Sequence, residues 1–381
     1  MGLKALVLCS DERIVRVLRR TLGDLEISVE LCLDSDAALR KLTRHRYEAI
    51  VVDCSGERSE EVLHSARSAA CNKHAVAVAI VEPIVGLKAV FEIGAHFVLY
   101  KPVTVEKAKS SFRAARALMK SERRRNARVA VEIPVIMRNL SGGTNIKVTT
   151  VDLSEGGIAI HLPDGRRRPS GRWQLVFTLP GHNAPLEIPA VLAWEGSGAQ
   201  AGVRFQQVPP ETTRLLREWL NRNSPDIEQD DPPIRCQLTD LSLGGCYLEL
   251  PSPFPPLSRV MLWMRAGETE VRVHGVVRVM HPDRGMGVEF TQSTPQHRKS
   301  VEDLLRLLME NRDLHPELLV APEGLDASAD QPRTRKSDTD DPLLQLFYGE
   351  NLSVEVFQDA LRRQRALTIP AQKSATTAAH V

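Results

Sequence analysis

The first third of the chain alternates short apolar runs with helix-like stretches. The apolar runs, which predict strands, lie at residues 5–9, 27–33, 49–53, 75–81 and 97–100. Between and after them, apolar residues recur three and four positions apart, as Ala108, Phe112, Ala115 and Met119 do. That is the period of an amphipathic helix. Five strands alternating with five helices predict an α/β domain over residues 1–120, a doubly wound parallel sheet covered on both faces.

Three polar residues stand at the carboxyl ends of these predicted strands. Asp11 follows the first strand, Asp53 ends the third, and Lys101 follows the fifth. Sites in open parallel sheets lie at this edge. Clustered carboxylates can hold a magnesium ion, and a lysine can balance the charge of an acyl phosphate. We therefore expect Asp11, Asp53 and Lys101 to share one site.

This arrangement resembles the receiver domain of two-component response regulators. The resemblance implies that Asp53 is the phosphoacceptor, that Asp11 and Asp53 hold magnesium, and that Lys101-Pro102 supplies the lysine that contacts the phosphate.

The chain departs from the receiver pattern at three positions. Ser10 stands where a second acid is usual, Val81 where Thr or Ser is usual, and Val98 where the switch aromatic is usual. Val81 has no hydroxyl to follow a phosphate. Two interpretations therefore stay open: a receiver phosphorylated at Asp53, or a degenerate receiver that binds a protein partner and keeps Asp53 as an inherited strand-end carboxylate.

After residue 128 the hydrophobic period changes from three or four to two. Strand-like segments follow at residues 145–151, 157–162, 172–179, 186–194 and 201–205, separated by glycine and proline turn signals. A helical pattern that carries Leu216, Trp219 and Leu220 comes next. Short strands at this spacing predict a small antiparallel β-barrel closed by a helix, over residues 121–222.

Two motifs of this barrel recur in the same order further along the chain. The segment that begins at Asp152 (DLSEGG) returns at Asp240 (DLSLGG), and the segment at Gly202 (GVRF) returns at Gly287 (GVEF). A second amphipathic helix follows the second copy. The repeat is therefore a whole domain, not a solenoid unit.

These residues resemble the PilZ family, small barrels that bind cyclic di-GMP. The family's ligand motif is RxxxR before the first strand, followed by (D/N)xSxxG at a turn. The resemblance assigns ligand contact to Arg123, Arg124, Arg128, Asp152, Ser154 and Gly157.

The chemistry of these side chains suits such a ligand. A guanidinium can hold a phosphate bidentately or grip guanine O6 and N7. A carboxylate can accept guanine N–H groups, and glycine lets a ligand approach the backbone closely. A solvated linker or a nucleic-acid patch is the alternative for Arg123–Arg128, and the downstream Asp152 motif weighs against it.

The second copy, over residues 231–310, lacks the arginine pair. Arg235 stands alone before Asp240, and residues 223–233 leave little room for the strand that should precede the motif. We expect Asp240, Ser242 and Gly245 to keep a turn-forming role in a degenerate domain that packs or contacts a partner.

Residues 311–381 look like a disordered tail, because residues 311–342 are rich in proline, aspartate, serine and charge. Ser353 can cap a short helix that carries Phe357 and Leu361. That helix either docks on a partner or packs on the chain's own domains.

Composition limits the function without naming it. The 50 basic residues nearly cancel the 48 acidic ones, only 4% of residues are aromatic, and no apolar run could span a bilayer. The six cysteines lack metal-ligand spacing, and no catalytic constellation stands out.

We therefore expect a cytoplasmic, non-enzymatic effector that binds cyclic di-GMP and a protein partner, without nucleic acid or membrane insertion. The alternative is an adaptor that binds no nucleotide and acts through its receiver and barrel surfaces, under control of phosphorylation at Asp53.

Overall fold

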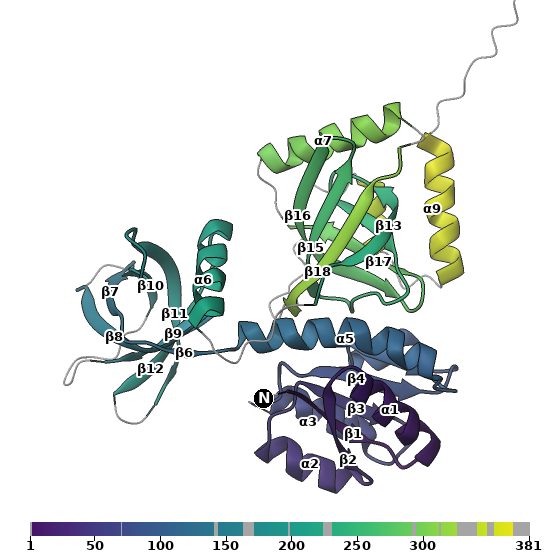
Figure 1. Ribbon diagram of the computed structural model, residues 1–381, viewed down its shortest axis with the longest axis horizontal. Coiled ribbons are helices and arrows are strands. Elements are labelled where there is room, and N and C mark those ends of the chain that lie inside the picture. The colour runs from purple at the N-terminus through teal and green to yellow at the C-terminus, as the bar shows by residue number, and fades with distance from the viewer. Residues whose placement is uncertain are drawn as a thin grey trace, which may run out of the picture. The chain divides into compact units, whose positions relative to one another are not determined.

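The computed structural model describes most of the chain (Figure 1). The described residues are 2–69, 71–140, 144–162, 171–196, 199–223, 231–291, 295–311, 314–325, 341–348 and 354–368. They form two compact units: Lys120–Asp230 is one, and Gly2–Met119 with Asp231–Val381 is the other. Within these ranges, no helix has the length and apolar character needed to span a membrane.

The N-terminal domain is a five-stranded parallel sheet of order β2-β1-β3-β4-β5. Its elements in chain order are β1 (Leu3–Leu8), α1 (Glu12–Asp24), β2 (Ile27–Cys32), α2 (Ser35–Arg44), β3 (Ala49–Asp53), α3 (Ser59–Ser68), β4 (Val76–Val81), α4 (Leu87–Glu92), β5 (Phe97–Tyr100) and α5 (Val105–Arg125). Every residue of β3 and β4 is buried. Helices cover both faces, which confirms the predicted doubly wound fold.

Alternate residues of each strand feed two separate cores. Val51 packs in the core to which α1 and α5 contribute, whereas its neighbour Val52 packs in the core of α2 and α3. Because successive side chains of a strand point to opposite faces, a continuous apolar run is what a sheet covered on both sides requires.

The second domain is a closed barrel with one additional short strand. Its elements are β6 (Val129–Ala130), β7 (Pro134–Asn139), β8 (Ile146–Ser154), β9 (Gly157–His161), β10 (Arg172–Phe177), β11 (Leu186–Glu195), β12 (Gln200–Phe205) and α6 (Pro210–Asn223). The sheet order is β6-β8-β7-β10-β11-β12-β9, and pairing of β8 with β9 closes a six-stranded ring. Helix α6 buries Leu216, Trp219 and Leu220 in the barrel core.

The third domain is a second closed barrel, of order β13-β14-β17-β16-β15-β18. Its elements are β13 (Ile234–Leu241), β14 (Gly245–Glu249), β15 (Ser258–Ala266), β16 (Thr269–His281), β17 (Gly285–Phe290), α7 (Pro295–Glu310) and β18 (Glu317–Leu325). Two antiparallel barrels, each with a helix, are the architecture predicted from the repeat.

One position in the ring of strands is filled differently in the two barrels. The first barrel uses a strand from the beginning of its domain, and the second uses a strand from the end. In the first barrel, β7 lies between β8 and β10, and it precedes both in the chain. In the second barrel, β18 lies between β13 and β15, antiparallel to each, and it comes after the closing helix. The strand for which residues 223–233 leave no room is therefore supplied from downstream.

Strand β18 corrects the expected end of this domain at residue 310. Residues 317–325 belong to the barrel, although their composition placed them in a disordered tail. Leu318 and Val320 point into the core with no exposed surface, while Pro322 lies at a shift of register where a lost backbone N–H is tolerated. The alternating pattern of residues 317–325 is short and contains a proline and two glutamates, so composition alone did not indicate a strand.

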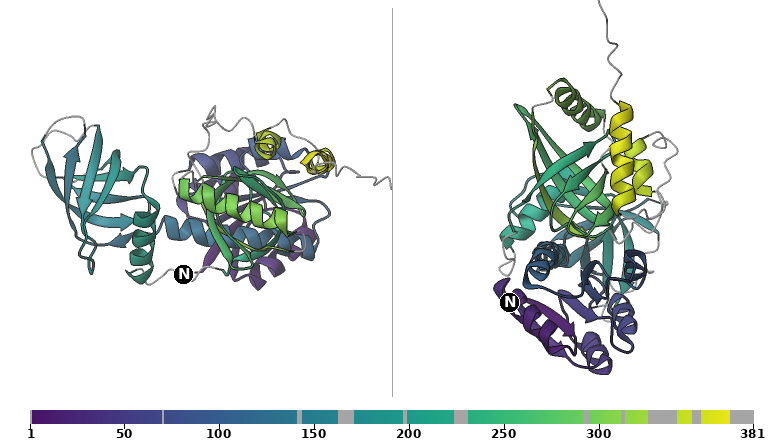
Figure 2. Two further views of the ribbon diagram at one scale, coloured as in Figure 1. Left: turned by 90° about the horizontal axis from the view of Figure 1, so that it is seen from above. Right: turned by 90° about the vertical axis from the view of Figure 1, so that its right-hand side faces the viewer.

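Two further helices, α8 (Pro342–Tyr348) and α9 (Val354–Thr368), lie beside the second barrel (Figure 2). They bury Leu343, Leu344, Phe347, Phe357 and Leu361 in one cluster with Tyr247 of β14. Of the two alternatives for the C-terminal helix, the structure shows the one packed on its own domain. Residues 326–340, 349–353 and 369–381 of the expected tail lie outside the described residues.

Candidate functional site

The DLSEGG turn of the first barrel is a tight connection between β8 and β9. The Ser154 hydroxyl donates a hydrogen bond to the Gly157 carbonyl at 3.0 Å. A Cβ atom on Gly157 would lie 2.2 Å from the Val203 carbonyl oxygen, whereas one on Gly156 would meet nothing within 4 Å. Ser154 and Gly157 are therefore required by the shape of the turn, and Gly156 leaves its outer surface open.

Arg128 meets this turn directly. Its Nη1 atom lies 2.9 Å from Asp152 Oδ1. The pairing of β6 with β8, which sets Ala130 opposite Asp152, brings the arginine to this place. The Arg128 side chain is 50% exposed and that of Asp152 is 22% exposed. A pair this accessible to water contributes about 0–1 kcal/mol, so both groups can exchange their partner for a ligand at little cost.

Arg123 and Arg124 lie in the last turn of α5, ahead of this site. Arg124 is buried, and one guanidinium nitrogen of Arg123, Nη1, is buried with no hydrogen-bond acceptor among the described residues. The structure thus joins Arg128, Asp152, Ser154 and Gly157 in one place and leaves the other two arginines on the helix that leads to it.

Asp152 stands at one end of a row of cross-strand neighbours. Asp152 is opposite Ala159, Ala159 is opposite Gly202, and Gly202 is opposite Trp194. Cross-strand neighbours share a face of the sheet. The row therefore begins with the Asp152 carboxylate and its partner Arg128, continues through two small residues, and ends with the indole of Trp194.

Two β-bulges place the ends of this row on the outer surface. The registers shift between Thr150 and Asp152 and between Leu192 and Trp194. Each bulge inserts one residue and so reverses which face the next side chain takes. Leu192 packs against the core, and Trp194 instead lies outside with 42% of its surface exposed.

Trp194 is the functional candidate that sequence reasoning missed. Its indole lies across Gly202, where a Cβ atom would come within 2.0–2.6 Å of three indole atoms. Strict alternation along β11 would have put this residue in the core. The available signal was a tryptophan at the end of the strand-like segment that precedes GVRF, in a chain with only four tryptophans.

The second barrel repeats the row with different side chains. Its neighbours are Asp240, Tyr247, Gly287 and Val279, with register shifts at the equivalent points. Arg235, the only arginine available before the motif, pairs instead with Glu317 of β18 at 3.0 Å. The arginine and the exposed indole of the first barrel thus have no counterparts in this row.

In the N-terminal domain, the side chains of Asp53 and Lys101 meet at the carboxyl edge of the sheet. Lys101 Nζ lies 2.9 Å from Asp53 Oδ1 and donates to the Ser55 hydroxyl at 2.8 Å. Burial lowers the pKa of Lys101, but its hydrogen bond to Asp53 and the negative charges of Asp53 and Glu82 together outweigh this, and the pKa is raised overall. Burial, with Asp53 nearby, raises the pKa of the Cys9 thiol to about 11, so this cysteine stays protonated.

Asp11 reaches the same edge but has a structural task. Its Oδ1 atom accepts the backbone N–H groups of Arg13 and Ile14, which caps α1. No group of three or more His, Cys, Asp or Glu side chains in the described part of the chain is arranged to hold a metal ion. Magnesium held by Asp11 and Asp53 would have to compete with Lys101 for Asp53.

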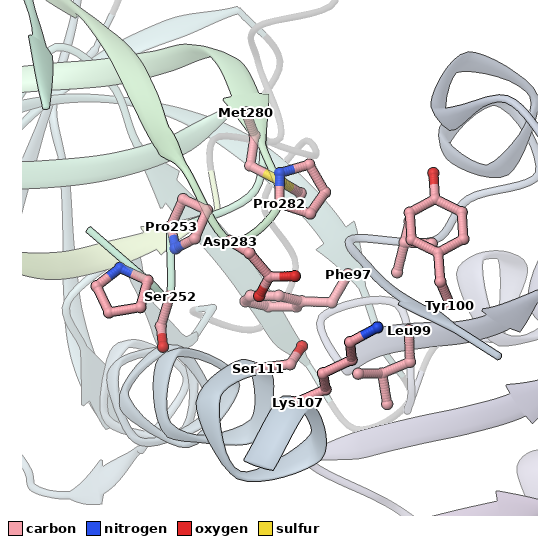
Figure 3. A pocket seen from close by; sticks show the side chains of 12 residues that line it. Phe97, Leu99, Tyr100, Lys107, Ser111, Ser252, Pro253, Met280, Pro282 and Asp283 are labelled. Carbon is pink, nitrogen blue, oxygen red and sulfur yellow. The ribbon is translucent and has the colours of Figure 1, made fainter. Parts of the chain in front are cut away.

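Two of the cavities in the unit that contains the receiver-like domain involve that domain, and they differ in size. An open pocket of about 430 Å³ lies at the Asp53 edge, lined by Cys9, Ser10, Asp34 and Arg58 among others. A second pocket, between α5 and the second barrel, is lined by residues that include Lys107, Ser111 and Asp283 (Figure 3). At about 50 Å³ the second pocket is too small for a nucleotide.

Two segments of the chain match one protein-family model. The model of the PilZ domain matches residues 122–222 and again residues 223–307. No curated protein matches the chain in sequence.

Three solved structures illustrate the similarities in fold. The receiver domain of the sensor histidine kinase PA1611 from Pseudomonas aeruginosa PAO1, with magnesium coordinated in its active-site cleft, is 20% identical over 31% of this chain and 98% of that chain (TM-score 0.28). The PilZ domain of CeSA from a cellulose-synthesizing bacterium is 19% identical over 26% and 97% (TM-score 0.22). The inhibitor of motility MotI/DgrA from Bacillus subtilis is 20% identical over 27% of this chain and 51% of that chain (TM-score 0.24).

Proposed function

We propose that this chain, which carries two PilZ domains after a receiver-like domain, is a signalling effector that binds cyclic di-GMP on the first of its two barrels. The observation that carries the proposal is the pairing of Arg128 with Asp152 on the DLSEGG turn, at one end of a row that ends in Trp194.

Each group of the row has a task on such a ligand. Arg128 can leave Asp152 to hold a phosphate or guanine O6 and N7, and the freed carboxylate can accept guanine N–H groups. Gly202 lets the indole of Trp194 lie close to the strands, and Trp194 keeps 42% of its surface exposed for contact with a flat ligand. Stacking of a base on an aromatic ring contributes about 1–3 kcal/mol, which is the role we give to Trp194.

The arginines also suggest how binding could be transmitted. Arg123 and Arg124 belong to α5, the last helix of the receiver-like fold, and Arg128 follows it directly. The buried Nη1 of Arg123 would gain an acceptor from the ligand. Ligand held by both the helix end and the barrel would then alter the arrangement of the domains and the binding of a protein partner.

Calorimetry of the intact chain with cyclic di-GMP tests this function. We expect heat from the wild-type chain, and loss of that heat in Arg124→Ala and in Arg128→Ala. Arg235→Ala is the matched control, because it removes an exposed arginine from the second barrel. Absence of heat with the folded wild-type chain would refute the proposal.

A second function is supported by the ion pair at Asp53. A protein-interaction adaptor could be controlled by phosphorylation there, because Lys101 already supplies the positive charge that an acyl phosphate needs. Against strong coupling, Val81 and Val98 are buried and apolar, so neither can follow the phosphate. Acetyl phosphate with magnesium should add the mass of a phosphoryl group to the wild-type chain and not to Asp53→Asn; an unchanged wild-type mass would favour the degenerate receiver.

A further inference from the structure

The turn of the second barrel is covered by the chain's own helix α8. Asp341, just before the helix, accepts a hydrogen bond from the Gly244 backbone N–H through Oδ2 at 3.1 Å. Its other oxygen, Oδ1, accepts from the N–H groups of Leu343 and Leu344 at 3.0 and 3.3 Å. A single carboxylate thus caps α8 and fixes it to the DLSLGG turn.

Leu344 and Phe347 of α8 lie so close to Gly244 and Gly287 that a larger residue at either glycine would collide with them. A Cβ atom on Gly244 would lie 2.6 Å from Leu344 Cδ1. A Cβ atom on Gly287 would lie within 2.5–2.9 Å of three ring atoms of Phe347. Both Leu344 and Phe347 are buried, at 3% and 7% exposure.

Phe347 takes the place over Gly287 that Trp194 takes over Gly202 in the first barrel. Gly287 and Gly202 are equivalent in the cross-strand row, but Trp194 comes from the neighbouring strand and Phe347 from a separate helix. The second barrel has Val279 at the position of Trp194, so its aromatic ring must come from elsewhere.

The rest of the second row contacts α8 and α9 through aromatic and polar side chains. Tyr247 replaces the small Ala159, and its hydroxyl shares a hydrogen bond of 2.9 Å with His281 Nδ1. Phe357 of α9 is 1% exposed, with its ring centre 4.7 Å from that of His281 and 5.3 Å from that of Tyr247. At the rim, the Tyr348 hydroxyl donates to Glu289 at 2.6 Å.

We infer that the second barrel is a peptide-recognition module, and that α8 occupies its recognition face in cis. The ligand it selects is a short helix with the pattern Asp-x-Leu-Leu-x-x-Phe, in which the aspartate caps the helix and binds the Gly244 amide and the phenylalanine lies over Gly287. The two contacts that define this ligand are an anionic group on the turn amide and an aromatic ring over the strand glycine. This inference does not depend on whether the first barrel binds cyclic di-GMP.

A synthetic peptide of residues 340–363, carrying a fluorescent label, tests this with full-length chains. In Phe347→Glu, a charge buried against Tyr247 and Gly287 should expel α8 and free the face. We expect this chain to bind the wild-type peptide at least tenfold more tightly than the wild-type chain does, because the cis helix competes at a high effective concentration. The same peptide carrying Phe347→Glu should not bind.

Two controls separate docking from misfolding. Gln345→Glu adds the same charge at an exposed position of α8 and should behave as the wild-type chain. Gly287→Val added to Phe347→Glu fills the receptor side and should abolish peptide binding. Hydrogen exchange of β15 and β16 reports whether the barrel stays folded in each variant.

Three outcomes would overturn the inference. The first is a folded Phe347→Glu chain that binds no peptide, and the second is a wild-type chain that binds the peptide as tightly as this variant. The third is a wild-type dimer in sedimentation that Phe347→Glu dissociates, because the helix on the face would then come from a second copy.

Discussion

Single residues decide what can rest on each barrel surface. Gly202 and Gly287 are the points at which an aromatic ring touches the strands, and a methyl group at either would overlap that ring. In the first barrel the ring belongs to Trp194 and remains 42% exposed, so one side of it is available to a ligand. In the second barrel the ring belongs to Phe347 and is buried.

Replacement of Trp194 by alanine should weaken cyclic di-GMP binding by about tenfold or more, because a stacking contact of about 1–3 kcal/mol is lost. Trp194→Phe keeps a flat ring and should recover most of the affinity. Titration calorimetry of the two folded variants measures the difference. Equal affinity in Trp194→Ala and wild type would remove Trp194 from the site and leave the arginine–aspartate end in place.

Among the elements, β18 has the clearest structural consequence. It closes the second barrel by pairing with β13 and β15, and it sends alternate side chains inside and outside. Without it the barrel would expose two strand edges, which are sites of misassembly. Residues 317–325 are therefore part of the domain and not an appendage to it.

Two adjacent leucines of β18 test this assignment. Leu318→Ala should destabilise the second barrel by about 2–5 kcal/mol, because Leu318 has no exposed surface. Leu319→Ala should change it by less than about 0.5 kcal/mol, because Leu319 is 36% exposed on the opposite face. Hydrogen exchange of β13 and β15 in the full chain measures both, and equal effects would contradict the register of β18.

The stability of the receiver-like domain should depend on pH through Glu30, which lies on the edge strand β2. Hydrogen bonds from Lys4 and then Lys41, with a further one from Tyr47, lower the pKa of Glu30 from 4.5 to about 2. Because the pKa is lower in the folded state, the stabilisation is present above pH 4.5 and is lost as the pH falls toward 2.

Glu30→Gln should therefore destabilise the domain near neutral pH, and its difference from wild type should shrink as the medium is acidified. Denaturant unfolding at several values between about pH 3 and pH 7 measures this difference. A difference that stays constant with pH would show that Glu30 keeps its ordinary pKa in the folded domain.

At the scale of the whole molecule, one architecture carries two different kinds of surface. Both barrels have the aspartate turn, the paired bulges and the strand glycine, but only the first combines them with Arg128 and an exposed indole. A small accessible ion pair leaves the first surface free for a ligand, whereas α8 and α9 cover the second.

The two turn aspartates provide a matched test of this division. Asp152→Ala should abolish binding of cyclic di-GMP to the intact chain, and Asp240→Ala should leave affinity and stoichiometry unchanged. Calorimetry under one set of conditions compares them. Loss of binding sites in Asp240→Ala would assign nucleotide to the second barrel and contradict its covering by α8.

Much of this organisation was determined by the sequence alone. Continuous apolar runs predicted the doubly wound sheet, alternation predicted the barrels, and two repeated motifs identified the second barrel as a copy of the first. These properties depend on local periodicity, since each residue's face follows from the period of its own strand or helix. The predicted turn residues, Asp152, Ser154 and Gly157, also lie together because they are close in sequence.

Only the tertiary structure decided the remaining features. The bulges beside Asp152 and Trp194 reverse the face that strict alternation predicts, and they depend on pairing with another strand. The position of β18 depends on β13 and β15, which are distant in the sequence. The position of the Phe347 ring depends on Gly287, which has no side chain to collide with it. Periodicity contains no information about which distant segments will meet, so the partner of each surface could be known only from the folded chain.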